Sequence, residues 1–268
     1  MKTVASRDNA AYKAMARLAS NAHERRRSGL SVLDGAHLLG AFLDAGRKPE
    51  EVMVSRAGLA DREVARLIER SAPARVTLLS DALFDSLSEL ASPTGVIASV
   101  RTPSGRAAAA DAALVLLLED VQDPGNVGTL LRSAAAAGAD SVILSSKCAF
   151  AWSPKVLRSA MGGHFALNIV EGADLGEFVR GYRGRSIALA PRAKSSLYDT
   201  DLTGPCAFLV GAEGAGLSPA LEAAASARVR IPMPGRVESL NAATAGSICL
   251  FEAVRQRVTR TIKLGNHR

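Results

Sequence analysis

Residues 113–132 read ALVLLLEDVQDPGNVGTLLR, and this stretch decides the fold. It begins with an unbroken apolar run, which is typical of a strand that a parallel sheet buries on both faces. A polar loop follows, and then a helical pattern that carries Arg132. The simplest structural interpretation makes Asn126 the cap of that helix and leaves Arg132 in water. A functional interpretation is also open, because α/β sheets bind ligands at the carboxyl edge of their strands.

Two further polar loops each follow an apolar run that predicts a buried strand. Residues 209–219, LVGAEGAGLSP, contain three glycines, which can take positive φ and let the backbone approach a ligand closely. Residues 231–241, IPMPGRVESLN, contain two prolines and then offer Ser239 and Asn241 at the expected start of a helix. Each loop could instead be an ordinary tight turn or helix cap. Since all three loops follow strand ends, we expect them to meet at one edge of the sheet.

The rest of the pattern divides the chain into two α/β domains. Linker-like composition, RTPSGR at 101–106, interrupts the periodicity, so we place the domains at residues 1–105 and 106–268. In the second domain apolar strands alternate with helical stretches, which indicates a mostly parallel sheet with helices on both faces. The expected helices cover residues 13–27, 34–45, 61–70, 81–90 and 240–257. The expected strands cover residues 52–54, 76–79, 96–100, 113–118, 141–144, 165–170, 186–190, 206–210 and 228–231.

The chain is basic, with 33 Lys and Arg against 26 Asp and Glu and a formal net charge of +7. This balance fits RNA or DNA binding but is weak support by itself. Arg25, Arg26 and Arg27 end the first predicted helix, just before Gly29. A solvated helix end is one interpretation of this cluster. We favour contact with phosphates, since three consecutive arginines repel one another unless an anion neutralises them.

Several classes of protein are disfavoured. Cys148, Cys206 and Cys249 are odd in number and lack zinc-ligand spacing, so we expect neither disulfides nor a metal and place the protein in a reducing cytoplasm. The sequence has no apolar signal core and no apolar run of membrane length. The phosphate-binding patterns of dinucleotide enzymes and P-loop NTPases are missing. His37 and His164 have no matched partner in the sequence, so we expect both to be structural.

The order of the three loops along the chain is more specific than any one of them. They read NxGxxxR over residues 126–132, GxEGxG over residues 211–216, and IPM followed by SLN over residues 231–241. With these motifs the chain resembles the SpoU (TrmH-like) branch of the knotted SPOUT RNA methyltransferases. The resemblance extends over residues 113–258, and weakly over residues 31–100.

The resemblance implies a deep trefoil knot in the second domain, which is an exception to the rule that protein chains do not thread loops. It implies a homodimer, and a smaller N-terminal α/β domain that is similar to a small ribosomal protein and binds the RNA substrate. It also implies S-adenosylmethionine as cofactor and methyl transfer to a ribose 2′-hydroxyl in RNA. The cofactor contacts would be Gly211, Ile231, Met233 and Leu240.

The resemblance also assigns the catalytic positions, which would be Asn126, Arg132, Glu213, Ser239 and Asn241. Arg132 matches a residue that is held to activate the 2′-hydroxyl, but a guanidinium stays protonated in proteins and is a poor base. We expect Arg132 to bind the adjoining RNA phosphate and stabilise the developing alkoxide, while a phosphate oxygen or water takes the proton. Asn126 and Glu213 would set loop geometry or the dimer contact, and Ser239 and Asn241 would orient the ribose or the knot.

Other functions stay open at this point. A knotted enzyme could methylate a base nitrogen, although the SLN form of the third motif favours ribose. A catalytically silent RNA-binding or ribosome-assembly factor could use the same fold, although Arg132 and all three motifs are intact. Among ribose methyltransferases, the N-terminal domain favours large-subunit ribosomal RNA over transfer RNA, by family analogy alone.

Overall fold

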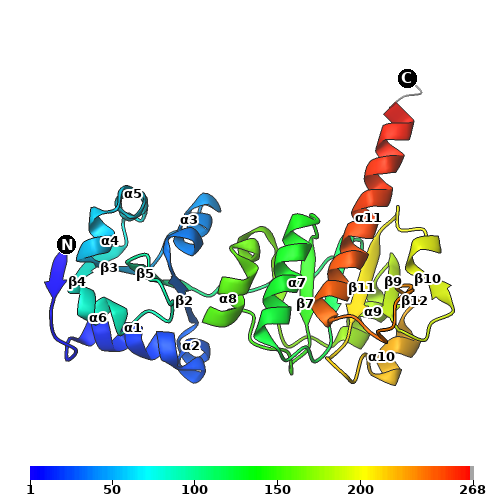
Figure 1. Ribbon diagram of the computed structural model, residues 1–268, viewed down its shortest axis with the longest axis horizontal. Coiled ribbons are helices and arrows are strands. Elements are labelled where there is room, and N and C mark those ends of the chain that lie inside the picture. Colours follow the sequence, from blue (N-terminus) through cyan, green and yellow to red (C-terminus); the bar gives the residue numbers. More distant parts are fainter. Residues whose placement is uncertain (266–268) are drawn as a thin grey trace. The chain divides into compact units, whose positions relative to one another are not determined.

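The computed structural model describes residues 1–265, with side chains through residue 260, and the chain forms two compact units (Figure 1). The first unit combines Met1–Pro103 with Trp152–Phe165. The second combines Ser104–Ala151 with the chain from Ala166 onward. Each unit contains one sheet and several helices, so the predicted α/β class is confirmed.

The first unit is built on a five-stranded mixed sheet with the order β1-β4-β3-β5-β2. Strand β5 runs antiparallel to β3 and β2, whereas β4 is parallel to β3 and β1. The strands are β1 (Lys2–Val4), β2 (Leu30–Asp34), β3 (Glu51–Ser55), β4 (Arg75–Leu79) and β5 (Val96–Arg101). The helices are α1 (Ala10–Ser20), α2 (Ala22–Ser28), α3 (Ala36–Asp44), α4 (Arg56–Ala60), α5 (Arg62–Arg70), α6 (Asp81–Asp85) and α8 (Pro154–Ala160).

Apolar clusters cover both faces of this sheet. Neighbouring residues of a strand point to opposite faces, so β3 supplies both clusters. Met53 packs with Met15 of α1 and with residues of α6, whereas Val52 and Val54 pack with Leu67 of α5 and with residues of α3. Burial of these side chains is the main force that holds the helices on the sheet.

The region predicted as one helix over residues 13–27 consists of two helices that meet at Asn21. The backbone N–H of Asn21 donates to the carbonyl of Arg17 and ends α1, while its side chain accepts from two backbone N–H groups of α2. Gly29, the expected stop, ends α2 with a φ of +65°. The helix expected over residues 81–90 is shorter, and the sequence pattern predicts neither β1 nor β2.

Residues 152–165 come from the second half of the sequence but belong to the first unit. Phe165 packs edge-on against Phe42 of α3, with ring centroids 5.3 Å apart. Arg158 of α8 forms an ion pair with Glu89 at 3.3 Å. The packing of α8 is therefore a tertiary feature that local sequence patterns do not indicate.

The second unit is built on a seven-stranded sheet with the order β10-β12-β9-β11-β6-β7-β8. All neighbouring strands run parallel, as the apolar runs predict, and the central strands β6 and β11 are fully buried. The strands are β6 (Leu114–Leu118), β7 (Ser141–Leu144), β8 (Asn168–Val170), β9 (Arg185–Leu189), β10 (Ser195–Ser196), β11 (Cys206–Val210) and β12 (Ala227–Arg230). The helices are α7 (Pro124–Ala136), α9 (Leu175–Gly181), α10 (Pro219–Ala224) and α11 (Ala242–Gly265).

Two details of this unit differ from the sequence pattern. The strand expected from residue 165 begins at Asn168, because Gly163–Ala166 form a 3-10 helix. The last helix begins at Ala242 rather than at residue 240. Within residues 1–265, no helix is both long enough and apolar enough to cross a membrane.

Candidate active site

The first motif is placed by the loop between β6 and α7. Asp123 caps α7, because its carboxylate accepts a hydrogen bond of 2.7 Å from the backbone N–H of Asn126. The simple structural interpretation of Asn126 as the cap of this helix is therefore wrong. Since Asp123 takes the capping role, the side-chain amide of Asn126 is available for other partners.

Asn126 connects residues from all three motifs. Its Nδ2 donates to Oε1 of Glu213 at 2.6 Å, and its Oδ1 accepts from Nδ2 of Asn241 at 2.9 Å. Oδ1 of Asn241 in turn accepts from the backbone N–H groups of Ala243 and Thr244, which caps α11. The expectation that the three loops meet at one edge of the sheet is confirmed. We call the side chains of Glu213, Asn126 and Asn241 the motif network.

The second motif is a tight backbone loop. Ala212 and Gly216 exchange two backbone hydrogen bonds of 2.9 and 3.1 Å. A Cβ added at Gly211 would lie 2.1 Å from the carbonyl carbon of Gly216, so only glycine fits there. The Glu119 carboxylate accepts from both the N–H (2.6 Å) and the hydroxyl (2.7 Å) of Ser218, which fastens the loop to the end of β6.

The third motif leads from β12 into α11, and α11 packs closely on α7. A Cβ at Gly246 would lie 2.4 Å from Cδ2 of Leu130, so the two helices approach through a glycine. The hydroxyls of Ser133 and Ser247 also form a hydrogen bond of 2.7 Å between them. Ser239 is exposed and makes no hydrogen bond to any residue that the structure describes. The close packing fixes α7, and with it Arg132, relative to the start of α11.

Arg132 lies on α7, six residues after Asn126, and its side chain is exposed. Six residues turn a helix by about 240°, so the two side chains leave α7 in different directions. Within the described part of the chain, Arg132 makes no hydrogen bond or ion pair. The structure thus joins Asn126, Glu213 and Asn241 but does not join Arg132 or Ser239 to them. The guanidinium keeps its donors for a ligand.

The three arginines of the first unit have different environments. Arg25 is only 6% exposed and its Nη1 donates to the carbonyls of Leu18 and Ala19, where it satisfies the C-terminal end of α1. Burial lowers the pKa of Arg25. Arg26 and Arg27 are exposed, and Arg27 pairs with Glu24 at 2.6 Å. Arg25 thus has a structural role, which leaves two arginines of the cluster on the surface.

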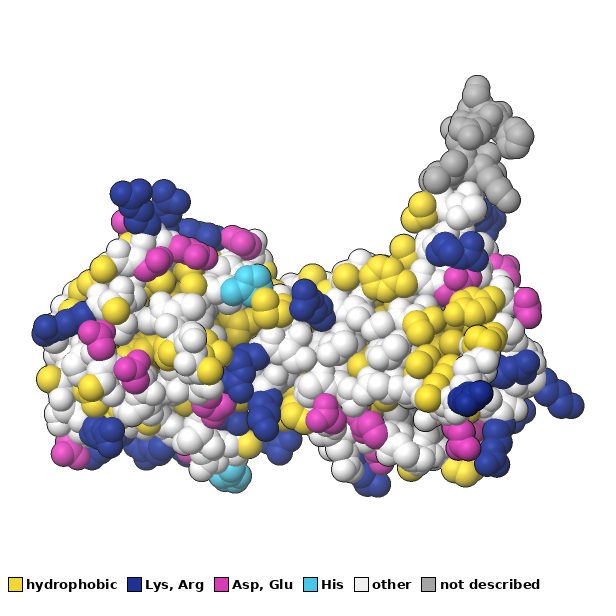
Figure 2. All heavy atoms as spheres, viewed as in Figure 1, with side chains coloured by type: hydrophobic (Ala, Val, Ile, Leu, Met, Phe, Trp, Pro, Cys, Tyr) yellow, Lys and Arg dark blue, Asp and Glu magenta, His cyan; other side chains and the backbone are white. Residues whose placement is uncertain are grey.

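The remaining titratable candidates lie outside the motif network. Nε2 of His37 lies 3.2 Å from the carbonyl oxygen of Met161, and the buried ring of His164 lies beside Trp152. The three cysteines are free thiols, and burial raises the pKa of each of them, which disfavours the reactive thiolate. Figure 2 shows Lys and Arg side chains spread over the visible surface of both units rather than gathered in one patch.

Two residues that organise the site are absent from the predicted set. Asp123 and Glu119 hold the first and second loops, and both lie between the end of β6 and the first motif. The signal for Asp123 is present in the sequence, because Asp followed by Pro is a common helix start. No local signal marks Glu119, since its partner Ser218 is 99 residues away.

Comparison with known proteins decides the family. The model of the SpoU rRNA Methylase family matches residues 113–251, which is just over half of the chain. The chain belongs to the SpoU rRNA methylase family. The model of the MRM3-like substrate binding domain matches residues 9–98. The prediction of an S-adenosylmethionine-dependent RNA 2′-O-methyltransferase of this family is thereby confirmed.

Individual relatives cover nearly the whole chain. It is 32% identical over 243 residues to an uncharacterized tRNA/rRNA methyltransferase of Synechocystis sp., which covers 87% of this chain and 86% of that protein. It is 30% identical over 254 residues to the 23S rRNA (guanosine(2553)-2′-O)-methyltransferase RlmP of Bacillus subtilis, and this match covers 94% of this chain and 98% of RlmP. The crystal structure of the SpoU methyltransferase AviRb from Streptomyces viridochromogenes in complex with AdoMet matches with a TM-score of 0.84 at 29% identity. This match covers 93% of this chain and 98% of the AviRb chain.

The loops of the second unit fit the chemistry of S-adenosylmethionine, which is AdoMet. A Cβ added at Gly214, Gly216 or Gly235 would meet nothing within 4 Å, so a ligand can approach the backbone there. Half-buried apolar side chains at these loops include Ile231, Met233 and Leu240. The cofactor has no phosphates, so it needs backbone groups and apolar surface rather than a phosphate-binding loop. The Glu213 carboxylate adds a negative charge that favours a sulfonium cation.

Proposed function

We propose that this protein transfers the methyl group of S-adenosylmethionine to a ribose 2′-hydroxyl of large-subunit ribosomal RNA. The observation that carries the proposal is the motif network, which brings one residue from each of three motifs to one edge of the sheet. The RNA class is supported by RlmP, whose name states 2′-O-methylation of 23S rRNA. The match of residues 9–98 to a substrate binding domain supports the same class.

In this proposal the second unit holds the cofactor and positions the RNA. The cofactor, when bound, supplies a methyl group on a positively charged sulfur. The backbone of the loop that begins at Gly211 and the side chains of Ile231, Met233 and Leu240 would hold it. The motif network keeps these loops in place, and Ser239, with its free hydroxyl, orients the ribose.

In this proposal Arg132 binds the RNA phosphate and stabilises the negative charge of the transition state. Its exposed guanidinium binds the phosphate beside the target ribose through paired N–H donors. It then stabilises the negative charge that develops on the 2′-oxygen, while a phosphate oxygen or water accepts the proton. A group that stays protonated serves this purpose better than it would serve as a base.

Further features belong to the same proposal. These are a trefoil knot in the second unit, RNA binding by the first unit through Arg26 and Arg27, a cytoplasmic location, and a domain boundary after residue 105. The boundary is supported by the two family matches, which end at residue 98 and begin at residue 113. A homodimer through α11 is supported by its exposed Phe251 and Val258, which lie two turns apart on one helix face.

The experiment for this proposal is a map of ribose methylation in total RNA from a strain that lacks the gene. We expect one 2′-O-methyl group of the large-subunit ribosomal RNA to disappear, and to return with the wild-type protein but not with Arg132→Ala. An unchanged ribosomal RNA map, with a loss in transfer RNA, would contradict the RNA class. Loss of a base methyl group would contradict the reaction.

A further inference from the structure

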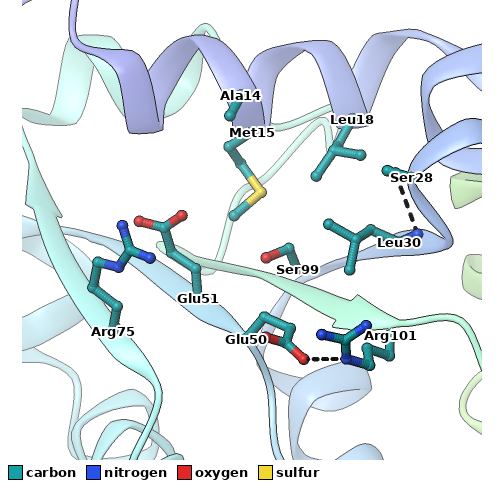
Figure 3. Close-up of a pocket in the computed structure, with 10 residues that line it drawn as sticks. All are labelled: Ala14, Met15, Leu18, Ser28, Leu30, Glu50, Glu51, Arg75, Ser99 and Arg101. Atoms are coloured by element: carbon teal, nitrogen blue, oxygen red, sulfur yellow. Dashed lines mark hydrogen bonds and ion pairs between the residues drawn. The ribbon is translucent and has the colours of Figure 1, made fainter.

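The first unit contains a hollow of about 320 Å³ at the edge of its sheet where β3 and β4 begin and β5 ends (Figure 3). Met15 and Leu18 of α1 cover one side of it with apolar surface. The polar groups that line it are Glu50, Glu51, Arg75, Ser99 and Arg101. None of these residues belongs to the three motifs, and the volume is that of a small-ligand site.

The charged groups of the hollow are unequally engaged. Glu50 and Arg101 form an ion pair of 2.8 Å and neutralise each other. Glu51 and Arg75 stand opposite each other on paired strands, and Figure 3 shows both side chains directed toward the same space. Among the residues that the structure describes, neither forms an ion pair. The only partner of the Glu51 carboxylate there is the Thr77 hydroxyl, at 3.4 Å. Glu51 therefore keeps acceptors, and Arg75 keeps donors, for a ligand.

Ser99 adds an uncommitted polar group to the hollow. The residue is only 4% exposed, and it lies between Glu51 and Leu30 in the hollow. Its hydroxyl makes no hydrogen bond to any residue that the structure describes, and it is not sealed from solvent. A ligand that displaces solvent from the hollow must therefore supply a polar partner to this hydroxyl.

We propose that this hollow binds an unpaired guanine base of the RNA substrate, an inference that rests on the proposed function. Guanine carries two adjacent donors, N1–H and the 2-amino group, which the Glu51 carboxylate can accept side by side. Its neighbouring O6 is an acceptor for Ser99 or Arg75. Unpaired RNA bases are commonly read on this edge while their faces lie against side chains, and the half-buried Leu30 offers such a face.

The other bases fit this set of groups less well. Adenine would place its N1 acceptor against the Glu51 carboxylate, and an unpaired acceptor facing a carboxylate is strongly unfavourable. Cytosine and uracil each present one donor group on this edge, with acceptors beside it. Only guanine satisfies both carboxylate oxygens and Ser99 together.

The test compares three short RNAs on the full-length protein by fluorescence anisotropy. The oligonucleotides are UUUGUUU and its counterparts with inosine or adenine in the centre. Inosine lacks only the 2-amino group, so it loses one charge-assisted hydrogen bond to Glu51. We expect the guanine RNA to bind about tenfold more tightly than the inosine RNA. Equal binding of these two RNAs would overturn the proposal.

Two matched variants separate recognition from charge. Glu51→Gln and Glu63→Gln remove the same charge from the same unit, and Glu63 is an exposed residue of α5. If only net charge mattered, both variants would bind all three RNAs more tightly by the same factor. We expect Glu51→Gln to weaken guanine RNA binding and erase the preference, and Glu63→Gln to retain it. A preference that survives Glu51→Gln overturns the proposal.

A second variant and a second measurement guard against misfolding and keep the two proposals apart. Ser99→Ala removes a hydroxyl that has no partner among the residues that the structure describes, so it should fold normally. It should weaken the guanine and inosine RNAs, which both carry O6, by the same few-fold factor and leave binding of the adenine RNA unchanged. S-adenosylmethionine affinity, measured on every preparation, should stay unchanged. Guanine preference without methyl transfer to ribosomal RNA would contradict the proposed function alone. Methyl transfer without guanine preference would contradict this inference alone.

Discussion

At the residue scale, the site depends on which polar groups are engaged within the protein. Asp123 takes the helix cap, which frees Asn126 to link Glu213 and Asn241, whereas Arg132 makes no hydrogen bond or ion pair with the residues that the structure describes. The motifs identify these residues in the sequence. They do not identify the cap, since Asp and Asn are equally good N-cap residues; the proline that follows Asp123 is the signal that distinguishes it from Asn126.

The residue-scale prediction concerns Arg132. Arg132→Ala removes the donors that hold phosphate and the developing alkoxide, so single-turnover methyl transfer should fall by at least about a hundredfold. The affinity for S-adenosylmethionine, measured by calorimetry, should barely change, because Arg132 makes no hydrogen bond to the described residues of the loops that we assign to the cofactor. Arg132→Lys keeps the charge without the planar fork. A lysine variant of normal rate would show that a point charge is enough and would contradict the bidentate role.

At the element scale, apolar runs in the sequence predicted the buried strands well but did not predict features that depend on tertiary packing. Residues 141–144 and 206–210 form strands with the predicted bounds, since each run is buried on both faces. The sequence pattern does not predict strand β2, because two of its buried residues, Ser31 and Asp34, are polar. Hydrogen bonds to the distant residues Thr102 and Ser88 satisfy these polar groups. The segment of α8 belongs to the first unit because α8 packs on β2 and the following Phe165 packs on Phe42, and these partners, more than a hundred residues away, are not encoded by any periodicity.

The loop of the second motif gives a prediction of its own. Gly211→Ala would place a methyl group within 2.1 to 2.3 Å of the backbone of Gly216 and Leu217, so the loop must move. We expect S-adenosylmethionine affinity to fall at least tenfold and stability to fall by about 1–3 kcal/mol, as overpacking does. Gly204→Ala is the control, since its Cβ would meet nothing within 4 Å. Thermal unfolding and cofactor titration check both; a Gly211→Ala variant that behaves like the control would refute the packing argument.

The placement of α8 makes a second prediction at this scale. A fragment of residues 106–268 keeps α8 but lacks Phe42, Glu89 and the sheet on which α8 packs. Trp152 and Leu157, which are buried in the full chain, should then be exposed. We expect this fragment to bind a hydrophobic dye and to aggregate, and Leu157→Ser to reduce both effects in the fragment. A fragment that stays monodisperse and binds no dye would show that α8 repacks without its partners.

At the scale of the whole molecule, the chain combines a unit that matches the MRM3-like substrate binding domain with a unit that matches the SpoU rRNA methylase family. In the single chain, Phe251 is 47% exposed and Val258 is 53% exposed on one face of α11, and Figure 2 shows hydrophobic side chains on the surface near α11. Neighbouring apolar residues of this kind on a surface helix mark an interaction site. The resemblance implies a homodimer, but the sequence pattern does not show that Phe251 and Val258 are exposed, because these two positions look like ordinary core residues of an amphipathic helix.

We therefore expect sedimentation equilibrium to give twice the chain mass at micromolar concentration. Phe251→Arg should shift the protein to a monomer and lower methyl transfer, because a charge at the centre of an apolar interface is costly to bury. S-adenosylmethionine binding by a folded monomer would show that the variant retains its fold. A wild-type protein that is monomeric and fully active would contradict the dimer.

The central claim is that the methyl group is transferred to a ribose oxygen, and its chemical form in the product tests this most directly. Ribosomal RNA from a strain that lacks the gene is incubated with the protein and methyl-labelled S-adenosylmethionine, and is then digested completely with alkali. Alkaline cleavage needs a free 2′-hydroxyl, so a 2′-O-methylated nucleotide survives joined to its neighbour. We predict that the label appears in alkali-resistant dinucleotides and is lost with Arg132→Ala. Label found in mononucleotides instead would place the methyl group on a base and contradict the account.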